Sequence, residues 1–196
     1  MTPRDSYLRR FRKYGVDPRA LKWQSQKAAE QRYLEITTLT DFNGKSVLDV
    51  GCGFGDLVAF INSKIKNFTY AGIDLVDEFV SAARNKYPGF SFSVGDYFSD
   101  PLQEKFDIIV ANGSLNSNVP DNYAFRKKAI KTMFEHAKEV VIFNMVGGLS
   151  PKKTARGSNV FFADASKIVG FCESLTSSVV LINHPGRREF TVIMPR

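Results

Sequence analysis

The chain has 196 residues and a formal net charge of +7, from 27 Lys and Arg and 20 Asp and Glu. This length suits one α/β domain with a sizeable core, and the apolar fraction of 43% excludes global disorder. No run of about 18 apolar residues is present, so we expect no membrane-spanning helix and no membrane partner. The basic balance permits an anionic partner but requires none.

The first 15 residues carry charges where a signal peptide needs an apolar stretch, so we expect a cytoplasmic protein. The two cysteines, Cys52 and Cys172, form no metal-ligand pattern. A buried, reduced pair fits the cytoplasm, and no metal site is expected.

Helices are expected before the first strand. Residues 3–14 predict a short basic helix that Gly15 ends. Asp17 is a typical N-cap residue, and Pro18 follows it at the first helical position. Together they predict a long helix over residues 18 to about 38. A turn signal at Asn43-Gly44 follows. We therefore expect an N-terminal helical extension over residues 1–44 that caps a domain over residues 45–196.

The stretch SVLDVGCGFGD, residues 46–56, predicts a strand, a glycine turn and a helix. Gly51, Gly53 and Gly55 alternate in the turn, and glycine lets a ligand approach the backbone closely. The helix that follows directs its free N–H groups and the positive end of its dipole at a ligand over the turn. A tight strand–helix connection without a ligand is the alternative.

The glycine spacing separates two kinds of nucleotide cofactor. A dinucleotide site has the pattern G-x-G-x-x-G, but here the glycines run G-x-G-x-G and Asp56 takes the third position, where it would face a pyrophosphate. Asp49, just before the turn, suits a cationic ligand such as an ammonium group. The pattern D-x-G-x-G-x-G resembles motif I of the class I S-adenosylmethionine (SAM) dependent methyltransferases. An NAD(P) enzyme is therefore the least favoured interpretation.

Strands and helices alternate along the rest of the chain. Short apolar runs predict strands at residues 69–73, 90–94, 106–111, 140–143, 179–182 and 190–194, with an aperiodic loop at 146–158. Such alternation implies a parallel sheet with helices on both faces, and the last two runs form a hairpin. The fold class is α/β: a doubly wound, mostly parallel seven-stranded sheet with a C-terminal antiparallel hairpin. The resemblance to class I methyltransferases implies the strand order 3-2-1-4-5-7-6.

In open α/β sheets, ligands bind beyond the carboxyl ends of the strands. Asp74 ends the second strand. The resemblance implies that its carboxylate accepts hydrogen bonds from the ribose hydroxyls of SAM and that Leu75 packs on the adenine ring. The alternative is a helix-cap or turn aspartate with no ligand. Asp96 is similar to the acid of that family that accepts the adenine N6 amino group, with Tyr97 beside the ring.

The methionine end of the cofactor is expected at the fourth strand. The backbone of Ala111 and Asn112 would face it. Trp23 is expected over the cavity, and Arg32 or Gln31 at the methionine carboxylate, because arginine binds a carboxylate bidentately. A core position for Trp23 and a solvated one for Arg32 carry equal weight.

No catalytic residue is assigned from the sequence. Methyl transfer from SAM, which leaves S-adenosylhomocysteine, is an in-line displacement that depends mainly on alignment. A base is needed only when the acceptor proton has a high pKa. His136 is expected on the surface of a helix, His184 in a turn, and Cys52 as a small residue of the glycine turn.

The acceptor is expected to be a small molecule. The loop Asn112-Gly113-Ser114-Leu115 lacks the Asn/Asp-Pro-Pro-Tyr/Phe motif of amino-directed nucleic acid methyltransferases. An RNA methyltransferase is the alternative, from the net charge, the basic helix and the basic residues of 152–156. A non-catalytic SAM-binding module is a third. The segments DPRALKW and EFTVIMPR resemble those of small bacterial methyltransferase-domain proteins.

Overall fold

The computed structural model describes residues 2–23 and 25–196 of the chain. The chain divides into two compact parts, Met1–Asp100 and Pro101–Arg196. Residue 44, the expected domain boundary, lies inside the first part, and that division stays a prediction. Within the described ranges, no helix has both the length and the apolar character needed to cross a membrane.

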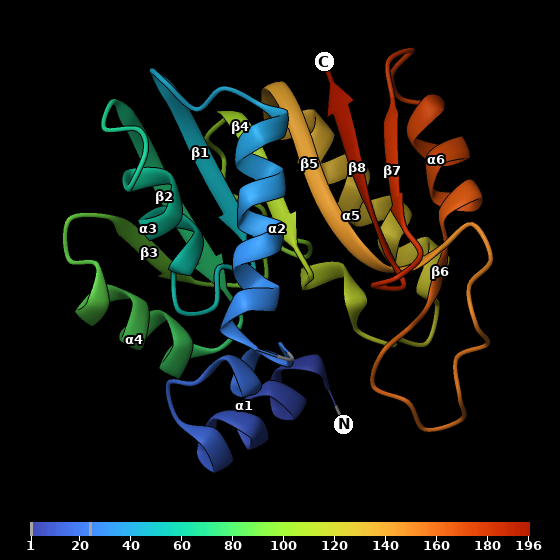
Figure 1. Ribbon diagram of the computed structural model, residues 1–196, viewed down its shortest axis with the longest axis horizontal. Coiled ribbons are helices and arrows are strands. Elements are labelled where there is room, and N and C mark those ends of the chain that lie inside the picture. The colour runs from blue at the N-terminus through green and yellow to red at the C-terminus, as the bar shows by residue number, and fades with distance from the viewer. Residues whose placement is uncertain (1, 24) are drawn as a thin grey trace. The chain divides into compact units, whose positions relative to one another are not determined.

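The first part contains a parallel sheet of three strands in the order β3-β2-β1 (Figure 1). They are β1 (Lys45–Val50), β2 (Phe68–Asp74) and β3 (Ser91–Val94). The last four residues of β1 are buried, as expected for a strand covered on both faces. In the register of β1 and β2, Val47 pairs with Tyr70.

Helices connect these strands, as the alternating pattern predicts. α3 (Asp56–Asn62) begins directly after the glycine turn and buries Leu57, Val58 and Ile61. α4 (Asp77–Lys86) follows β2, carries Asp77 and Glu78 in its first turn, and packs on β2 and β3. Acidic side chains in a first turn stabilise the positive end of the helix dipole.

The N-terminal region differs from the prediction. The basic helix is confirmed as α1 (Pro3–Tyr14). The single helix over residues 18 to about 38 is wrong: a 3-10 helix, η1 (Pro18–Leu21), ends at Lys22, and α2 (Gln26–Leu39) is separate. The reason is a second N-cap, because Ser25 Oγ accepts a hydrogen bond from the Ala28 amide at 3.2 Å.

Aromatic side chains attach α1 and η1 to the rest of the first part. Phe11 packs on Phe79 with ring centroids 5.8 Å apart, and Tyr7 packs on Phe79 at 6.1 Å. Phe79 in turn packs on Phe54 of the glycine turn at 5.0 Å. The apolar face of α1 therefore belongs to a core cluster beside that turn.

In the second part, strands run in the order β4-β5-β8-β7, and a short further strand, β6 (Ala163–Asp164), pairs with β5 (Figure 1). The strands of that order are β4 (Phe106–Asn112), β5 (Ala137–Gly148), β8 (Glu189–Pro195) and β7 (Val180–His184). β4 and β5 are parallel, whereas β8 is antiparallel to both of its neighbours. The predicted C-terminal hairpin is confirmed, as is the α/β class, and the order within each part agrees with the expected one.

The end of β5 was predicted as a loop and is a strand. β6 (Ala163–Asp164) pairs with Gly147 and Gly148, and β8 pairs with Val146. A Cβ atom on Gly147 would lie 1.9 Å from the Ala163 carbonyl oxygen. Glycine is present here because a second backbone approaches closely, so it does not mark a loop.

The helices of the second part are η2 (Ser114–Asn116), α5 (Asn122–His136) and α6 (Ala165–Glu173). Arg126 of α5, the first residue of the basic run Arg126-Lys127-Lys128, is fully buried. Its guanidinium donates to the Ser117 and Asn122 carbonyl oxygens, both at 2.8 Å. Arg126 thus supports the loop before α5 and adds nothing to an exposed basic patch.

Candidate cofactor site

The glycine turn is closed by backbone hydrogen bonds. The amides of Gly51 and Cys52 both donate to the Ile73 carbonyl oxygen, at 2.8 and 3.1 Å, and the Gly55 amide donates to the Cys52 carbonyl oxygen at 2.9 Å. The turn therefore joins the end of β1 to the end of β2, where the first part's parallel strands present their carboxyl ends.

Two glycines of the turn are required for different reasons. Both have positive φ, 56° at Gly53 and 76° at Gly55. A Cβ on Gly55 would lie 2.8 Å from Phe92 Cζ in the core, so packing alone demands glycine there. A Cβ on Gly53 would lie 2.9 Å from Leu21 Cδ1 of η1. The N-terminal region thus contacts the face of the turn that is expected to meet the cofactor.

Asp74 holds the turn from the end of β2. Its Oδ2 accepts a hydrogen bond from the Gly53 amide at 3.0 Å, and its Oδ1 accepts one from the Val76 amide at 3.0 Å. Burial raises the pKa of Asp74 to about 6, although these backbone donors lower it. The carboxylate therefore supports the turn, and its two oxygens can each still accept a further hydrogen bond from a ligand.

Asp49 is a second carboxylate near the turn, and it is buried. It is 3% exposed and accepts a hydrogen bond from the Tyr70 hydroxyl at 2.8 Å. Burial raises its pKa to about 7, the Tyr70 bond lowers it, and the charges of Asp74 and Asp56 raise it further. No Lys or Arg pairs with Asp49 or Asp74 in the part of the chain that the structure describes.

These two carboxylates reduce stability when they ionise without a ligand. Both pKa values lie above the ordinary value of 3.8. Their contribution to stability is therefore full below about pH 4 and is lost as the pH rises through about 6 to 7. A cationic ligand would compensate for this cost, so the pair suits a positively charged cofactor.

Asp56 takes no part in this pair. Its carboxylate forms an ion pair with Lys86 Nζ at 2.6 Å. It lines a cavity of about 260 Å³ between α2 and α3, together with Gln26, Glu30, Tyr33, Ala59, Phe60, Ser63, Lys86 and Tyr87. None of the predicted cofactor residues lines this cavity, so we do not place the cofactor there.

The predicted adenine residues lie around the ends of β2 and β3. The Gly95 amide donates to the Asp74 carbonyl oxygen at 2.9 Å, which brings the two strand ends together. Asp96, next in the chain, is exposed, and its Oδ2 accepts a hydrogen bond from the Ser99 hydroxyl at 2.8 Å. Tyr97 is buried, and Leu75 packs against the cluster that contains Phe54 and Phe79.

Trp23 and Arg32 contact each other. The Arg32 guanidinium lies 4.8 Å from the Trp23 ring, and it also donates to the Ala28 carbonyl oxygen. Cation–π contact on this geometry orients both side chains. Their proposed contacts with the cofactor stay predictions.

The predicted residues of the fourth strand belong to the second part. Ala111 is fully buried at the end of β4. Asn112 is 8% exposed, and its Oδ1 and Nδ2 have no hydrogen-bond partner among the described residues. Ser114 Oγ, in η2, is also buried and without a hydrogen-bond partner among the described residues. A buried amide without a partner is costly, and a polar ligand group would satisfy it.

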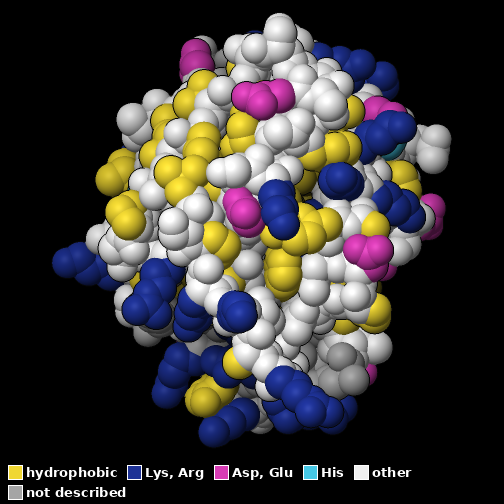
Figure 2. Space-filling view, turned by 90° about the vertical axis from the view of Figure 1, so that its right-hand side faces the viewer, with side chains coloured by type: hydrophobic (Ala, Val, Ile, Leu, Met, Phe, Trp, Pro, Cys, Tyr) yellow, Lys and Arg dark blue, Asp and Glu magenta, His cyan; other side chains and the backbone are white. Residues whose placement is uncertain are grey.

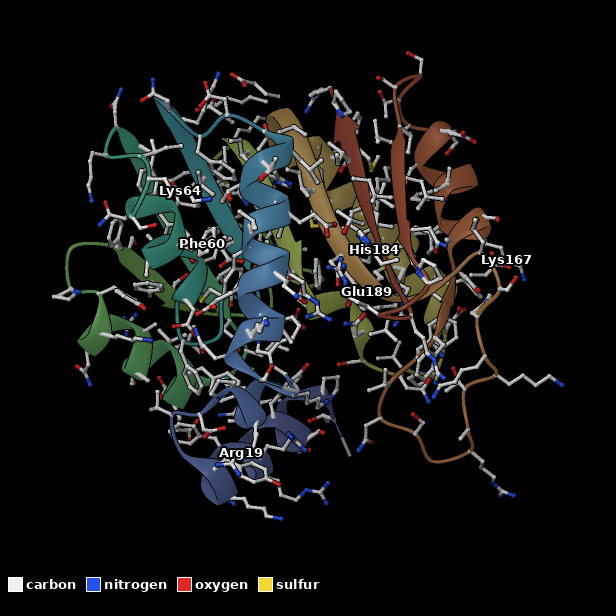
Figure 3. The ribbon with its side chains drawn as sticks, in the orientation of Figure 1. Arg19, Phe60, Lys64, Lys167, His184 and Glu189 are labelled. Carbon is white, nitrogen blue, oxygen red and sulfur yellow. The ribbon has the colours of Figure 1, made fainter. Side chains whose placement is uncertain are left out.

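The two histidines and Cys52 are the side chains whose residue types most often serve as a base or a nucleophile. His136 Nδ1 lies 2.7 Å from the Thr132 carbonyl oxygen on α5. His184 is the last residue of β7 and pairs in register with Glu189 of β8. Both residues are labelled in Figure 3. Burial raises the pKa of the Cys52 thiol well above its ordinary value, so this cysteine is not a nucleophile at neutral pH.

Sequence reasoning missed three contacts at this site. Tyr70 donates to Asp49, Leu21 lies on Gly53, and Tyr7 lies close enough to Asp74 for that carboxylate to raise its pKa. Only Tyr70 has a signal in the sequence: alternation along β2 places it on the same face of the strand as Asp74, which is a predicted site residue. Contacts from α1 and η1 have no local signal.

The family is shown by a direct comparison. A family described as "Methyltransferase domain" matches residues 41–149, which is more than half of the 196 residues. The chain belongs to this family. SAM is thus its cofactor, as the sequence predicts.

Individual relatives agree with this assignment. Rv1506c of Mycobacterium tuberculosis, named a methyltransferase, is 26% identical over 155 residues, which cover 76% of this chain and 92% of that protein. Protein 235L of Invertebrate iridescent virus 6, also named a methyltransferase, is 33% identical over 89 residues. That match covers 43% of this chain, and the chain spans only 34% of the viral protein.

The fold is shared with a solved methyltransferase of similar length. Magnesium protoporphyrin IX methyltransferase from Synechocystis PCC 6803, with bound S-adenosylhomocysteine, superposes with a TM-score of 0.70. The match covers 98% of this chain and 97% of that one at 14% identity. At this identity the likeness is one of fold.

We expect the affinity of this methyltransferase-domain protein for SAM to rise with pH. The cofactor carries positive charge, so it favours the ionised forms of Asp49 and Asp74, whose pKa values are about 7 and about 6. For each proton displaced, the binding constant falls by up to about tenfold per pH unit below the pKa. Calorimetry from about pH 5 to 8, in buffers of different ionisation enthalpy, measures the affinity and the protons released.

Tyr70→Phe provides the matched test of this pH dependence. It removes the hydrogen bond that lowers the pKa of Asp49, so the curve should move to higher pH. Tyr14→Phe removes a hydroxyl from the end of α1, where basic side chains surround the ring, and should leave the curve unmoved. A SAM affinity that is constant across this range would contradict the assignment of Asp49 and Asp74.

Proposed function

We propose that this protein transfers a methyl group from SAM to a small-molecule acceptor. The observation that carries the proposal is a pair of carboxylates at the glycine turn: Asp49 is 3% exposed, and Asp74, which is partly buried, holds the turn through the Gly53 amide. Neither carboxylate has a basic partner in the described chain, which suits a ligand that brings its own positive charge.

The proposed cofactor contacts follow from the residues around this turn. Asp74 would accept the ribose hydroxyls, and Asp49 would favour the cationic methionine end. Leu75, Asp96 and Tyr97 would hold the adenine. Asn112 would offer its unpartnered amide to a polar group of the cofactor or acceptor. Gly51, Gly53, Gly55, Trp23, Arg32 and Ala111 complete the proposed set.

SAM supplies a methyl group bonded to a positively charged sulfur, which is already reactive toward a nucleophile. The protein then needs mainly to align the acceptor and to exclude water. An acceptor with a proton of low pKa would need no base.

Two features favour a small acceptor over RNA: the sequence of the loop after β4, and the burial of Arg126, which therefore cannot contact RNA. That loop has no proline, and Arg126 is buried in the second part. The solved structure of the same fold is named for a porphyrin substrate. Lys152 lies 4.3 Å from the Phe162 ring, so part of the basic loop at 152–156 is also engaged within the protein.

A labelling experiment tests the proposed function. Purified protein is incubated with SAM that carries a labelled methyl group and with a cell extract, which is then separated into RNA, protein and small molecules. We expect label in the small-molecule fraction, and none with the Gly53→Val variant. Label in RNA alone would overturn the small-molecule acceptor. Transfer to no fraction, despite SAM binding, would favour a non-catalytic SAM-binding module.

A further inference from the structure

The segment formed by α1 and η1, residues 2–22, holds most of the net positive charge. It contains seven basic residues and two acidic ones, a balance of +5 against +7 for the whole chain. The basic residues are Arg4, Arg9, Arg10, Arg12, Lys13, Arg19 and Lys22. On the face that Figure 2 draws, Lys and Arg side chains are more prominent than Asp and Glu.

Both acids of this segment already have partners. Asp5 Oδ2 accepts a hydrogen bond from the Thr2 amide at 3.2 Å, in the capping box of α1. Asp17 forms an ion pair with Arg19 at 2.8 Å (Arg19 is labelled in Figure 3). The remaining cations of the segment are therefore not neutralised from within it.

Arg10 and Lys22 lie close together, because both donate to the Arg19 carbonyl oxygen, and Arg9 precedes Arg10 on α1. Lys22 Nζ lies 3.9 Å from the centroid of the Tyr7 ring. Arg10 is fixed beside it, because its Nε donates to the Arg19 carbonyl oxygen at 2.8 Å. Burial, and then the charges of Arg10 and Arg9, lower the pKa of Lys22 to about 8. In the described chain, no carboxylate pairs with Arg9, Arg10 or Lys22.

The backbone holds Lys22 in an unfavourable conformation. Its φ is 63°, a value that few residues other than glycine adopt. Its amide donates to the Arg19 carbonyl oxygen at 3.2 Å, and the Trp23 amide donates to the Pro18 carbonyl oxygen at 3.1 Å. The backbone thus holds Lys22 at a conformational cost, with its ammonium group over the Tyr7 ring. Strain of this kind concentrates at functional sites.

The aromatic residues of the segment are unsuited to stacking on nucleic acid bases. Tyr7 and Phe11 pack on Phe79. Tyr14 is surrounded by Arg10, Lys13 and Arg19, at 5.2, 5.1 and 4.9 Å from its ring centroid. Binding of single-stranded nucleic acid relies on exposed aromatic platforms, whereas a compact anion needs only converging cations.

We propose that Arg9, Arg10 and Lys22 form a binding site for the phosphate group of a small molecule. Guanidinium groups bind phosphate oxygens in a bidentate manner, and lysine adds a point charge. Leu21, next to Lys22 in the chain, lies against Gly53 of the glycine turn, where a Cβ atom would be 2.9 Å from Leu21 Cδ1. The phosphate site is therefore next to the proposed cofactor site, yet binding at it does not depend on methyl transfer.

The test compares two charge reversals in the full-length protein, with inorganic pyrophosphate as the probe. Arg9→Glu places an acid in the cluster. Lys128→Glu makes the same change of charge on α5, at an exposed side chain outside the cluster. Calorimetry should show pyrophosphate binding by the wild-type protein, weakened at least about tenfold by Arg9→Glu and less than about twofold by Lys128→Glu.

A second substitution and two further ligands complete the test. Lys22→Asn introduces a residue that tolerates positive φ, and it should also weaken pyrophosphate binding. Arg9→Glu and Lys22→Asn should keep the wild-type melting temperature within a few degrees and should still bind SAM. Equal loss in Arg9→Glu and Lys128→Glu, or no binding by the wild-type protein, would overturn the site. Binding of a 20-nucleotide RNA that depends on Arg9, without binding of pyrophosphate, would overturn the small-molecule ligand.

Discussion

Replacing Gly53 by valine is expected to abolish SAM binding while the protein still folds. Gly53 has a φ of 56°, so any other residue adds about 1–2 kcal/mol of backbone strain. A Cβ there would also lie 2.9 Å from Leu21 Cδ1, at the end of a flexible side chain that can move. The valine methyl groups would fill the space over the turn, so we expect a loss of at least about 100-fold in affinity by calorimetry.

Two further variants separate the causes of that loss. Gly44→Val also replaces a glycine of positive φ, 74°, but its Cβ would meet only Asn67 Nδ2 at 3.8 Å. It should lose stability and keep its affinity for SAM. Adding Leu21→Ala to Gly53→Val removes the clash with η1 and should recover stability without affinity. Normal SAM binding by folded Gly53→Val would remove the glycine turn from the cofactor site.

The local parts of the fold and site could be predicted because their causes lie close together in the sequence. The glycine turn is one such case: the strand before it, the positive φ at Gly53 and Gly55, and the start of α3 at Asp56 all come from one short stretch. The alternation of strands and helices in each part is another. Period and turn chemistry are sufficient for such elements.

The errors arose where a distant residue decides the local structure. Gly147 and Gly148 have a loop composition, yet they continue β5 because the Ala163 backbone pairs there. Arg126 stands in a basic run, yet it is buried because the Ser117 carbonyl oxygen needs its guanidinium. The Tyr70 bond to Asp49 depends on the register between β1 and β2, which no local pattern defines.

The break between η1 and α2 is a different kind of error, because its signal was present in the sequence. Ser25 is an N-cap residue, and it accepts from the Ala28 amide as such a residue should. Apolar residues spaced through the region favour one continuous helix instead. The cap prevails because it satisfies free amides at a helix start, and it leaves η1 able to reach the glycine turn through Leu21.

Asp74→Ala is expected to weaken SAM binding by about 10- to 100-fold, because hydrogen bonds to a charged group contribute about 1.5–3 kcal/mol. The same change should lower stability, since the carboxylate accepts hydrogen bonds from the Gly53 and Val76 amides. Loss of affinity alone would therefore not distinguish contact with the ribose from support of the turn. Asp77→Ala, at an exposed acid on the first turn of α4, controls for the loss of one negative charge.

A cycle that alters both protein and ligand makes this distinction. S-adenosylhomocysteine and an analogue without the two ribose hydroxyls are each titrated into the wild-type protein and Asp74→Ala. If Asp74 binds the ribose, the substitution should weaken binding of the complete ligand much more than binding of the analogue, because only the first has hydroxyls to lose. If Asp74 only supports the turn, both ligands should lose affinity equally, and the ribose assignment would fall while the glycine turn remained the cofactor site.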